Sequence, residues 1–276
     1  MDFFKKMIFT SSGIITIAIL LIIVLYILIN GLQFIDLEFL LSNPIDSGKS
    51  GGIFPMIISS FYIVILTALI AIPIGVGSAI YMTQYCRSSI LIAIIRFCSQ
   101  TLAAIPSIIY GLFGFAFLIM YLKLDWSLFT ASLVLAIMSI PTIFQTSEIN
   151  INSVPNELIE ASFGLGARKS QTIIHVILPS AISGIFTGII LALTRAISEA
   201  AAVMYVVGST FTVPLSVFDS GRPLPLHLYI LANEGVSIDN AYATASVLVI
   251  IVLIITILSN YCLNKYQNKV GCNDEN

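Results

Sequence analysis

Two charged side chains stand inside one of the most apolar stretches of this sequence. Arg195 and Glu199 lie four residues apart in an apolar run that covers about residues 173–207. On a helix this spacing places both side chains on one face, close enough to pair. A charge at the centre of a membrane-spanning helix costs about 2.5–3.5 kcal/mol, so we expect both groups to face protein or water.

Two interpretations of this pair stay open. The first is a self-neutralising ion pair that holds helices together. The second is an arginine that lines or gates a path for an anion, with the glutamate as a counter-charge that keeps the anion from binding too tightly. Other polar side chains inside apolar runs either line the same path or hydrogen-bond a neighbouring helix: Ser107, Tyr110, Thr142 and Gln145.

A compact polar segment, EASFGLGARKS, lies between two apolar runs at residues 160–170. Its last five residues are superficially like a phosphate-binding loop, but that loop needs a glycine directly before its lysine. Arg168 precedes Lys169 here, so nucleotide binding is not expected. A plain amphipathic surface loop is the other interpretation of the isolated segment.

The residues before this segment favour a helix start. Ser153 or Asn156 is expected to cap a short helix, and Gly164 and Gly166 then allow a left-handed stop and a sharp turn. We therefore expect 153–172 to be a folded loop and not a flexible connector.

The cysteines and histidines predict neither a metal site nor a disulfide framework, and no cofactor is expected. No CxxC spacing occurs and each histidine stands alone: Cys86, Cys98, Cys262, Cys272, His175 and His227. An intramembrane enzyme is disfavoured, because neither a Gly-x-Ser-x-Gly turn nor an intramembrane His/Asp cluster occurs. The sequence carries no machinery for ATP hydrolysis.

The composition places the chain in a membrane. Hydrophobic residues make up 58% of the sequence and charged residues 9%, with a mean hydropathy of +1.03, whereas soluble domains carry about 25% charged residues. An all-α polytopic membrane protein with six transmembrane helices is therefore predicted. The first span is interpreted as uncleaved, because it is long for a signal peptide and no small-residue cleavage site follows it.

A span needs about 20 apolar residues, and six runs qualify: about 8–30, 54–84, 92–122, 127–148, 173–207 and 242–263. The second, third and fifth runs are longer than needed and contain Pro73, Pro106 and Pro179. We expect these helices to be tilted, kinked or broken.

Lysine and arginine positions orient the spans. With the N-terminus inside, one side holds Lys5, Lys6, Arg87, Arg96, Arg168, Lys169, Lys265 and Lys269, and the other only Lys49, Lys123 and Arg222. The positive-inside rule then places both termini and the polar segment in the cytoplasm. The predicted organisation is an N-terminal tail, first span and outer loop (1–50), a transmembrane core (51–265) and a cytoplasmic C-terminal tail (266–276).

The polar segment has the pattern of a known motif. Glu160-Ala161-Ser162 is followed by Gly166 and, nine residues later, by Val176-Ile177-Leu178-Pro179. This resembles the EAA motif of ABC-importer permeases of the type I fold, with Ser162 in place of an alanine and Val176 in place of an isoleucine. The resemblance implies that the loop docks into a partner ATPase through Glu160, Ala161, Ser162, Gly166, Leu178 and Pro179.

Further runs resemble the PstA family of phosphate-importer permeases. They are GGIFP at 51–55, IPIGVGSAIY at 72–81, IPSIIYGLFG at 105–114 and RAISEAA at 195–201. The resemblance covers about residues 50–265 and implies a permease subunit that passes phosphate by alternating access in a prokaryotic plasma or inner membrane. It favours the path interpretation for Arg195 and Glu199, with Ser107 and Tyr110 as further candidates.

The same resemblance implies the partners. They are a homodimeric ATP-binding subunit, a second, PstC-like permease, an extracytoplasmic phosphate-binding protein and membrane lipid, with no nucleic acid. A PstC-like identity, or an ABC permease for another small solute such as sulfate or molybdate, stays open as an alternative. A channel or secondary transporter is disfavoured, because no inverted repeat of broken spans is visible.

The outer loop at 208–241 carries one arginine against three acids, Asp219, Glu234 and Asp239. This charge does not favour direct capture of an anion. The loop is interpreted either as a dock for a binding protein or as a plain solvated loop.

Overall fold

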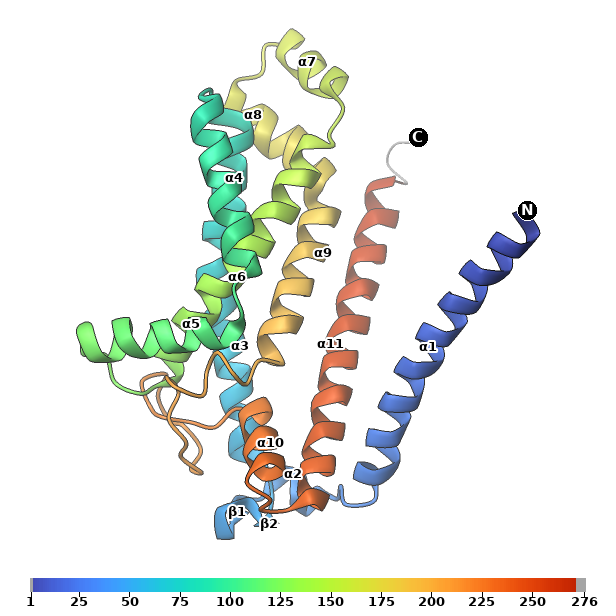
Figure 1. The fold of residues 1–276 in the computed structure, drawn as a ribbon. Helices are drawn as coiled ribbons and strands as arrows, with labels where there is room; N and C mark the ends of the chain where they lie inside the picture. Colours follow the sequence, from blue (N-terminus) through green and yellow to red (C-terminus); the bar gives the residue numbers. More distant parts are fainter. Residues whose placement is uncertain (1, 272–276) are drawn as a thin grey trace.

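The computed structural model describes residues 2–271, and within that range the chain is a bundle of helices (Figure 1). The long helices are α1 (Asp2–Leu32), α3 (Phe54–Ile80), α4 (Ser89–Ala104), α6 (Leu128–Asn152), α9 (Leu178–Ile197) and α11 (Ile238–Gly271). The short helices are α2 (Leu37–Leu41), α5 (Ser107–Phe113), α7 (Asn156–Gly164), α8 (Lys169–Thr172) and α10 (Leu224–Asn233). Three π-helical stretches, η2 (Tyr81–Tyr85), η3 (Gly114–Tyr121) and η4 (Ile173–Ile177), continue or precede helices, and a 3-10 turn, η1 (Asp46–Gly48), joins the antiparallel strands β1 (Pro44–Ile45) and β2 (Ser50–Gly51).

The described part of the chain holds five helices that are long and apolar enough to cross a membrane: Phe9–Leu32, Phe54–Tyr85, Leu128–Asn152, Lys169–Ile197 and Ile238–Lys265. A sixth span follows if α4 and the segment Ser107–Tyr121 count as one, although they meet at 101°. Figure 1 shows this second segment leaving the bundle sideways; we call it the lateral arm (residues 107–121). The run at 92–122 is thus a broken span, as the proline predicted. Pro106 has no N–H for the helix ladder and restrains the residue before it.

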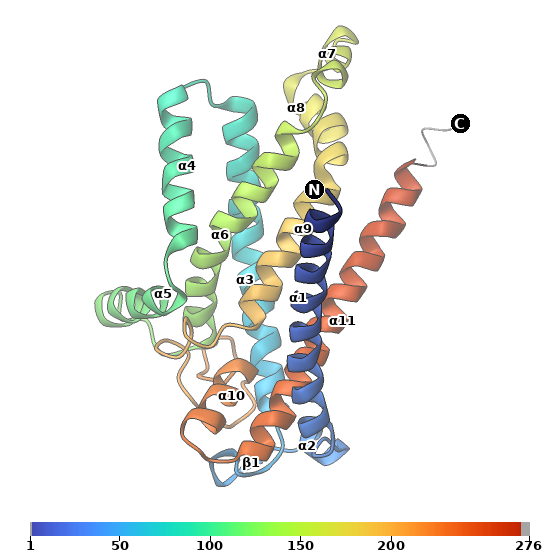
Figure 2. The ribbon, with the colours of Figure 1, turned by 45° about the vertical axis from the view of Figure 1, so that its right-hand side comes forward.

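The start of α1, the end of α11 and the whole of α7 lie at one end of the bundle (Figures 1 and 2). The opposite end holds α2, β1, β2 and α10. The positions of these elements agree with the predicted topology, in which the chain ends and the polar segment share a side. α11 continues as far as Gly271, so the first residues of the expected tail are helical, and Cys272 with the rest of 272–276 lies outside the described residues.

α6 is the centre of the bundle. Two thirds of its most apolar window is buried (67%), whereas the window of α1 is 0% buried. α6 packs against α3, α4 and α9, and small residues on those helices allow the close approach. A Cβ added at Gly75 of α3 would meet the Cγ2 of Ile143 at 2.7 Å, and one at Gly184 or Gly188 of α9 would overlap Asn150 or Thr146. The glycines are therefore packing residues.

The fifth span ends earlier than the sequence predicted. The run at 173–207 was expected to be one span, but helix begins at Lys169 and ends at Ile197, and residues 198–223 form turns and irregular chain. No proline or glycine occurs between 198 and 207. Tertiary packing decides this break, because Ala202, Val203, Val206 and Val207 are all fully buried in the main apolar cluster.

The end of the bundle opposite α7 is folded and not a plain solvated loop. Arg222 is 7% exposed, stacks at 4.0 Å on the Phe211 ring and donates from Nε to Ser209 Oγ at 2.9 Å. His227 is 1% exposed, and its ring lies where a Cβ on Gly48 would stand. Asn240 donates to the carbonyls of Gly48 and Lys49 at 3.0 Å. These contacts tie the turn 46–49 to α10 and α11.

Gly75→Ala tests the contact between α3 and α6. The added methyl would meet the β-branched Ile143, which cannot move aside without shifting α6, and such overpacking costs about 1–3 kcal/mol. We expect a lower melting temperature of the purified protein in detergent. Gly77→Ala is the matched control, because nothing lies within 4 Å of its Cβ position. Equal melting temperatures for the two variants would show that this contact is not tight.

The burial of His227 predicts that the folding stability depends on pH. Burial, aided by the Arg222 cation, lowers the pKa of His227 from 6.5 to about 4. The unfolded chain therefore binds a proton more readily between those values, and folding stability falls as the pH falls through this window, by at most about 1.4 kcal/mol per pH unit. We expect the melting temperature to drop from pH 7 to 4.5, and His227→Gln to flatten that dependence. Parallel profiles for both proteins would contradict it.

Candidate functional site

The polar segment at residues 160–170 forms an exposed helix with its own folded support. None of the residues of α7 is buried. Glu160 and Ala161 are exposed, and large apolar side chains stand out beside them: Leu158 is 48% exposed, Phe163 46% and Leu165 90%. Small residues, the two carboxylates of Glu157 and Glu160, and exposed apolar groups on one short helix and its C-cap are the composition of a surface that another protein covers.

The start of α7 differs from the predicted one. Asn156 is the first helical residue, Pro155 stands at the N-cap position, and α7 has no side-chain cap. Ser153 closes α6, because its N–H donates to the Ile149 carbonyl at 3.1 Å. The prediction that Ser153 or Asn156 caps the helix was therefore wrong. The prediction failed because the gap between α6 and α7 is short, so that Ser153 closes the last turn of α6.

The end of α7 is a Schellman turn centred on Gly166. This residue has φ +82°. Its N–H donates to Phe163 O at 2.9 Å, and the next N–H, of Ala167, donates to Ser162 O at 3.1 Å. That is the bond pattern that satisfies the last carbonyls of a helix when a left-handed residue follows it. Gly166 is the predicted left-handed stop, whereas Gly164 is still helical.

Ser162 joins α7 to the next helix. Its Oγ lies 3.0 Å from Thr172 Oγ1, and Thr172 is 1% exposed. α8 is itself fixed at its start, since the Arg168 N–H donates to the Gln171 side chain at 2.8 Å. The Ser162 side chain, which stands where the motif has its second alanine, is therefore small and also makes a hydrogen bond. It links the exposed helix to the polypeptide that enters the fifth span.

The inner side of the loop rests on one apolar cluster, here called the junction cluster. It gathers Ala79 and Met82 from α3 and η2, Ile151 from α6, Val154, Ile173 and Ile177, with Ile159 of α7 packed against it. Side chains of three spans and of the exposed helix thus pack together in one cluster. A displacement of α7 would be transmitted to α3, α6 and α9 because packed side chains cannot be compressed.

Leu178 and Pro179 lie apart from the exposed helix. Both are half-buried at the start of α9, directly after the π-helical η4. Glu160, Ala161, Ser162 and Gly166 are brought together at α7 and its turn. Of the six residues of the motif, the structure therefore places four on the exposed loop and two at the base of the fifth span.

Arg195 and Glu199 form the expected ion pair, but not within one helix. Arg195 lies in the last turn of α9 and Glu199 lies just beyond its end, with 3.7 Å between Nε and Oε1. The side chain of Arg195 is 50% exposed and that of Glu199 is 15% exposed. A contact of this length leaves most of the guanidinium donors free for another partner.

Tyr110 and Ser107 lie near the break between α4 and α5. Tyr110 Oη donates at 2.6 Å to the Leu102 carbonyl, which also accepts from the Ile105 N–H at 3.1 Å, so the tyrosine ties α5 to the last turn of α4. Tyr110 lies in one apolar cluster with Ala196 and Ala202, and its neighbour Gly111 packs against the carbonyls of Ala201 and Ala202. The lateral arm and the irregular chain after α9 therefore meet close to Ala196, the residue that follows Arg195. Ser107 begins α5 and is half-buried.

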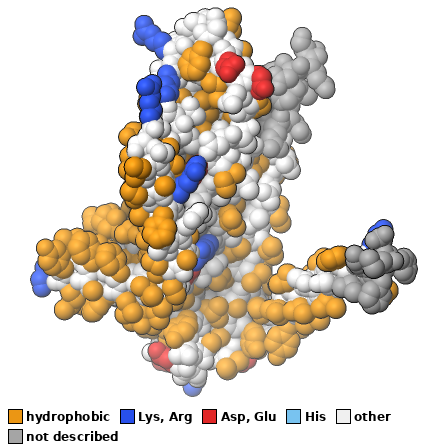
Figure 3. All heavy atoms as spheres, turned by 45° about the horizontal axis from the view of Figure 1, so that its top comes forward, with side chains coloured by type: hydrophobic (Ala, Val, Ile, Leu, Met, Phe, Trp, Pro, Cys, Tyr) orange, Lys and Arg blue, Asp and Glu red, His pale blue; other side chains and the backbone are white. Residues whose placement is uncertain are grey.

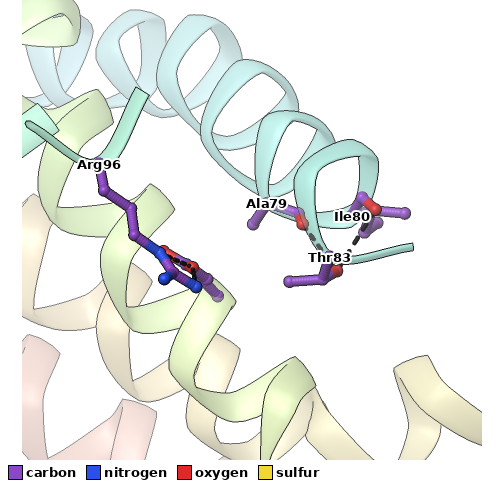
Figure 4. A network of polar contacts seen from close by, with 5 residues as sticks. Ala79, Ile80, Thr83 and Arg96 are labelled. Atoms are coloured by element: carbon purple, nitrogen blue, oxygen red, sulfur yellow. Dashed lines mark hydrogen bonds and ion pairs between the residues drawn. The ribbon is translucent and has the colours of Figure 1, made fainter. Parts of the chain in front are cut away.

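The structure adds a polar pair that the sequence interpretation missed. Arg96 was expected among the cytoplasmic basic residues, but it lies in the middle of α4 and binds Glu148 of α6 (Figure 4). Gln145, one turn earlier on α6, donates to Ser99 Oγ at 3.1 Å. An arginine inside an apolar run, with a glutamate in the next span, was the available signal. Its pairing could be known only from the packing of α4 on α6.

Comparison with known proteins finds one family model and several relatives that are similar to this chain. A family model described as "Binding-protein-dependent transport system inner membrane component" matches residues 71–269. The chain is 32% identical to the probable ABC transporter permease protein YqgI of Bacillus subtilis (strain 168), over 93% of this chain and 92% of that protein. It is 30% identical to the phosphate transport system permease protein PstA of Pasteurella multocida (strain Pm70), over 83% and 82%.

A solved structure has the same fold. It is a bacterial alginate ABC transporter in complex with an alginate pentasaccharide-bound periplasmic protein, and the likeness has a TM-score of 0.65 over 93% of this chain and 94% of that chain. The sequence identity is 16%, so the likeness concerns the fold alone.

Gly166→Ala tests the turn that ends α7. An alanine at φ +82° costs about 1–2 kcal/mol, which corresponds to roughly tenfold faster hydrogen exchange at the amides of Gly166 and Ala167, measured by mass spectrometry. Gly164→Ala is the control, since Gly164 is helical with open space around it; there we expect slower or unchanged exchange. The same acceleration in both variants would disprove a special role for residue 166.

Proposed function

The chain belongs to the family of binding-protein-dependent transport system inner membrane components, and from that premise we propose that it is the permease subunit of an ATP-driven importer of inorganic phosphate. The exposed helix α7 with the EAA pattern carries the permease part of the proposal. The phosphate part is supported by relatives named as PstA proteins at about 30% identity. The chain itself is a multi-pass membrane protein of a family of transport subunits.

The proposed coupling runs through α7. An ATP-hydrolysing partner, a homodimer, would contact Glu160 and the small residues beside it, with Leu158, Phe163 and Leu165 as its apolar contacts. Movement of that partner displaces α7, and the junction cluster passes the displacement to α3, α6 and α9. Ser162 fixes α7 to Thr172, so the loop moves as one unit and the fifth span moves with it.

The proposed substrate path includes Arg195. Phosphate is recognised by N–H donors arranged around its oxygens, and half of the Arg195 side chain is exposed. Glu199 competes with phosphate for the guanidinium, so the anion is held weakly enough to be passed on. Tyr110 and Ser107 lie at the adjacent helix break and are proposed to bound the path there.

The proposed orientation places α7 and both chain ends in the cytoplasm of a prokaryote. The opposite end then faces the extracytoplasmic side, where Leu215 is 91% exposed and Phe218 67%. We assign this end to contact with a phosphate-binding protein. The solved alginate transporter supports a partner of that kind, because it is a complex with a periplasmic binding protein. A second, PstC-like permease completes the proposed assembly.

Uptake of radiolabelled phosphate tests the proposal. We expect uptake at micromolar phosphate to fall in cells that lack this chain and to return when the gene is restored, with sulfate uptake unchanged. Loss of sulfate or molybdate uptake in place of phosphate would move the chain to another substrate. Co-purification supplies the second measurement: a permease carries a bound ATPase, whereas a channel does not.

Charge variants at Arg195 test the path. Arg195→Gln should reduce phosphate uptake at least tenfold, because the path loses its cation, while assembly with the ATPase stays normal by co-purification. The charge-swapped protein, Arg195→Glu with Glu199→Arg, separates the two interpretations of the pair. Persistent loss of uptake supports the path, whereas full recovery would show that the pair is structural.

A further inference from the structure

A second arginine–glutamate pair lies in the half of the bundle that contains α7. Arg96 Nε and Nη2 both donate to one oxygen of Glu148, Oε1, at 2.6 and 2.5 Å (Figure 4). The Glu148 side chain is 9% exposed and the Arg96 side chain 52%. A guanidinium has five N–H donors and Glu148 takes two, so three remain for another partner.

The pair lines a pocket of about 470 Å³ between α4 and α6, whose lining also includes the apolar side chains of Phe144 and Ile149. Arg96 and Gln100 reach it from α4, and Gln145, Glu148 and Asn152 reach it from α6. A guanidinium and three amide side chains supply N–H donors from two walls, and Glu148 supplies a carboxylate that Arg96 already neutralises. Donors converging on one pocket are the arrangement that recognises a small oxyanion.

The pocket lies nearer to the α7 end of the bundle than Arg195 does. Tyr110, which lies in one apolar cluster with Ala196, donates to the carbonyl of Leu102 near the end of α4. Arg96 stands six residues earlier on α4, about 9 Å closer to the α7 end. Figure 3 shows Lys and Arg side chains at several levels of one face, between the α7 end and the lateral arm.

We propose that the pocket of Arg96 and Glu148 is a second, weak site for the transported oxyanion, between the level of Arg195 and the cytoplasmic end of the path. The proposal rests on the proposed function. The anion displaces Glu148 from part of the Arg96 guanidinium when it enters. The carboxylate recaptures the guanidinium as the anion leaves, so release does not expose an unpaired cation.

The competing explanation is a latch that only clamps α4 to α6. A latch needs complementary partners and is indifferent to which helix carries which charge. An anion site needs its cation at the pocket position and suffers when that cation is lost, even if α4 and α6 stay joined. The neutral pair therefore distinguishes the two, because its two glutamines can still bond α4 to α6 while the pocket has lost its cation.

The experiment measures phosphate uptake by the complete transporter complex in liposomes of zwitterionic lipid. For Arg96→Gln, and for the neutral pair Arg96→Gln with Glu148→Gln, we expect at least a fivefold lower Vmax. For Glu148→Gln we expect a lower Vmax together with a lower KM, since Arg96 then holds the anion longer. Arg87→Gln is the control for loss of one exposed cytoplasmic cation, and it should behave as the unaltered protein.

Normal uptake by the neutral pair, Arg96→Gln with Glu148→Gln, would overturn the proposal, because the pocket then works without its cation. Co-purification with the ATPase shows that each variant assembles, and Arg96→Lys, which keeps the charge, should retain more uptake than Arg96→Gln. If the unaltered complex takes up no phosphate, the proposed function fails and this site fails with it. If it does and the variants match it, only this site fails.

A lipid headgroup offers the same phosphoryl chemistry as free phosphate. Binding of radiolabelled inorganic phosphate to the nucleotide-free complex in zwitterionic nanodiscs separates the sources. We expect Glu148→Gln to retain at least threefold more phosphate than the unaltered complex, and Arg96→Gln to abolish this gain. The proposal would be overturned, and the pocket assigned to lipid, by two results together. Both variants would retain as much phosphate as the unaltered complex, and their uptake would differ from it only when anionic lipid is added.

Discussion

Close packing around α6 is the constraint on which the rest of this structure depends. Apolar side chains gain no hydrophobic driving force against one another within lipid, so helices associate through fitted contacts and small residues. Gly75 of α3 and Gly184 and Gly188 of α9 let both helices approach α6 more closely than any larger residue would allow. Because α6 also carries Glu148 and leads directly into α7, this packing sets the position of the pocket beside Glu148 and of the exposed helix together.

The second constraint is that polar backbone groups inside a membrane need partners within the protein. At the Pro106 break the last turn of α4 keeps its Leu102 carbonyl paired, because both the Ile105 N–H and the Tyr110 hydroxyl donate to it. The lateral arm then packs on the irregular chain after α9, through Gly111 and the carbonyls of Ala201 and Ala202. Two broken elements thus support each other, in a cluster that includes Ala196, the residue that follows Arg195.

In the proposed function the three candidate regions have successive mechanical and electrostatic roles. α7 is the surface proposed for a partner, and the junction cluster joins it to α3, α6 and α9. Both arginine–glutamate pairs involve these same helices or α4 beside them. A movement that enters at α7 therefore reaches the elements that carry both pairs, which is what the coupling of a partner's chemistry to the passage of an anion requires.

The sequence by itself determined the class, the approximate spans and the exposed motif. Apolar runs of about 20 residues and the scarcity of charge predicted the bundle, Pro106 predicted the broken span, and the spacing from Glu160 to Pro179 predicted the loop and its left-handed glycine. These features are local, since each follows from the hydropathy, dihedral freedom or order of nearby residues. The tertiary structure alone decided where α9 ends, that Ser162 binds Thr172, that Arg222 and His227 are buried, and that Arg96 pairs with Glu148. Those outcomes join residues 10 to 52 positions apart or depend on packing around them, and single-chain patterns do not specify which helix faces meet.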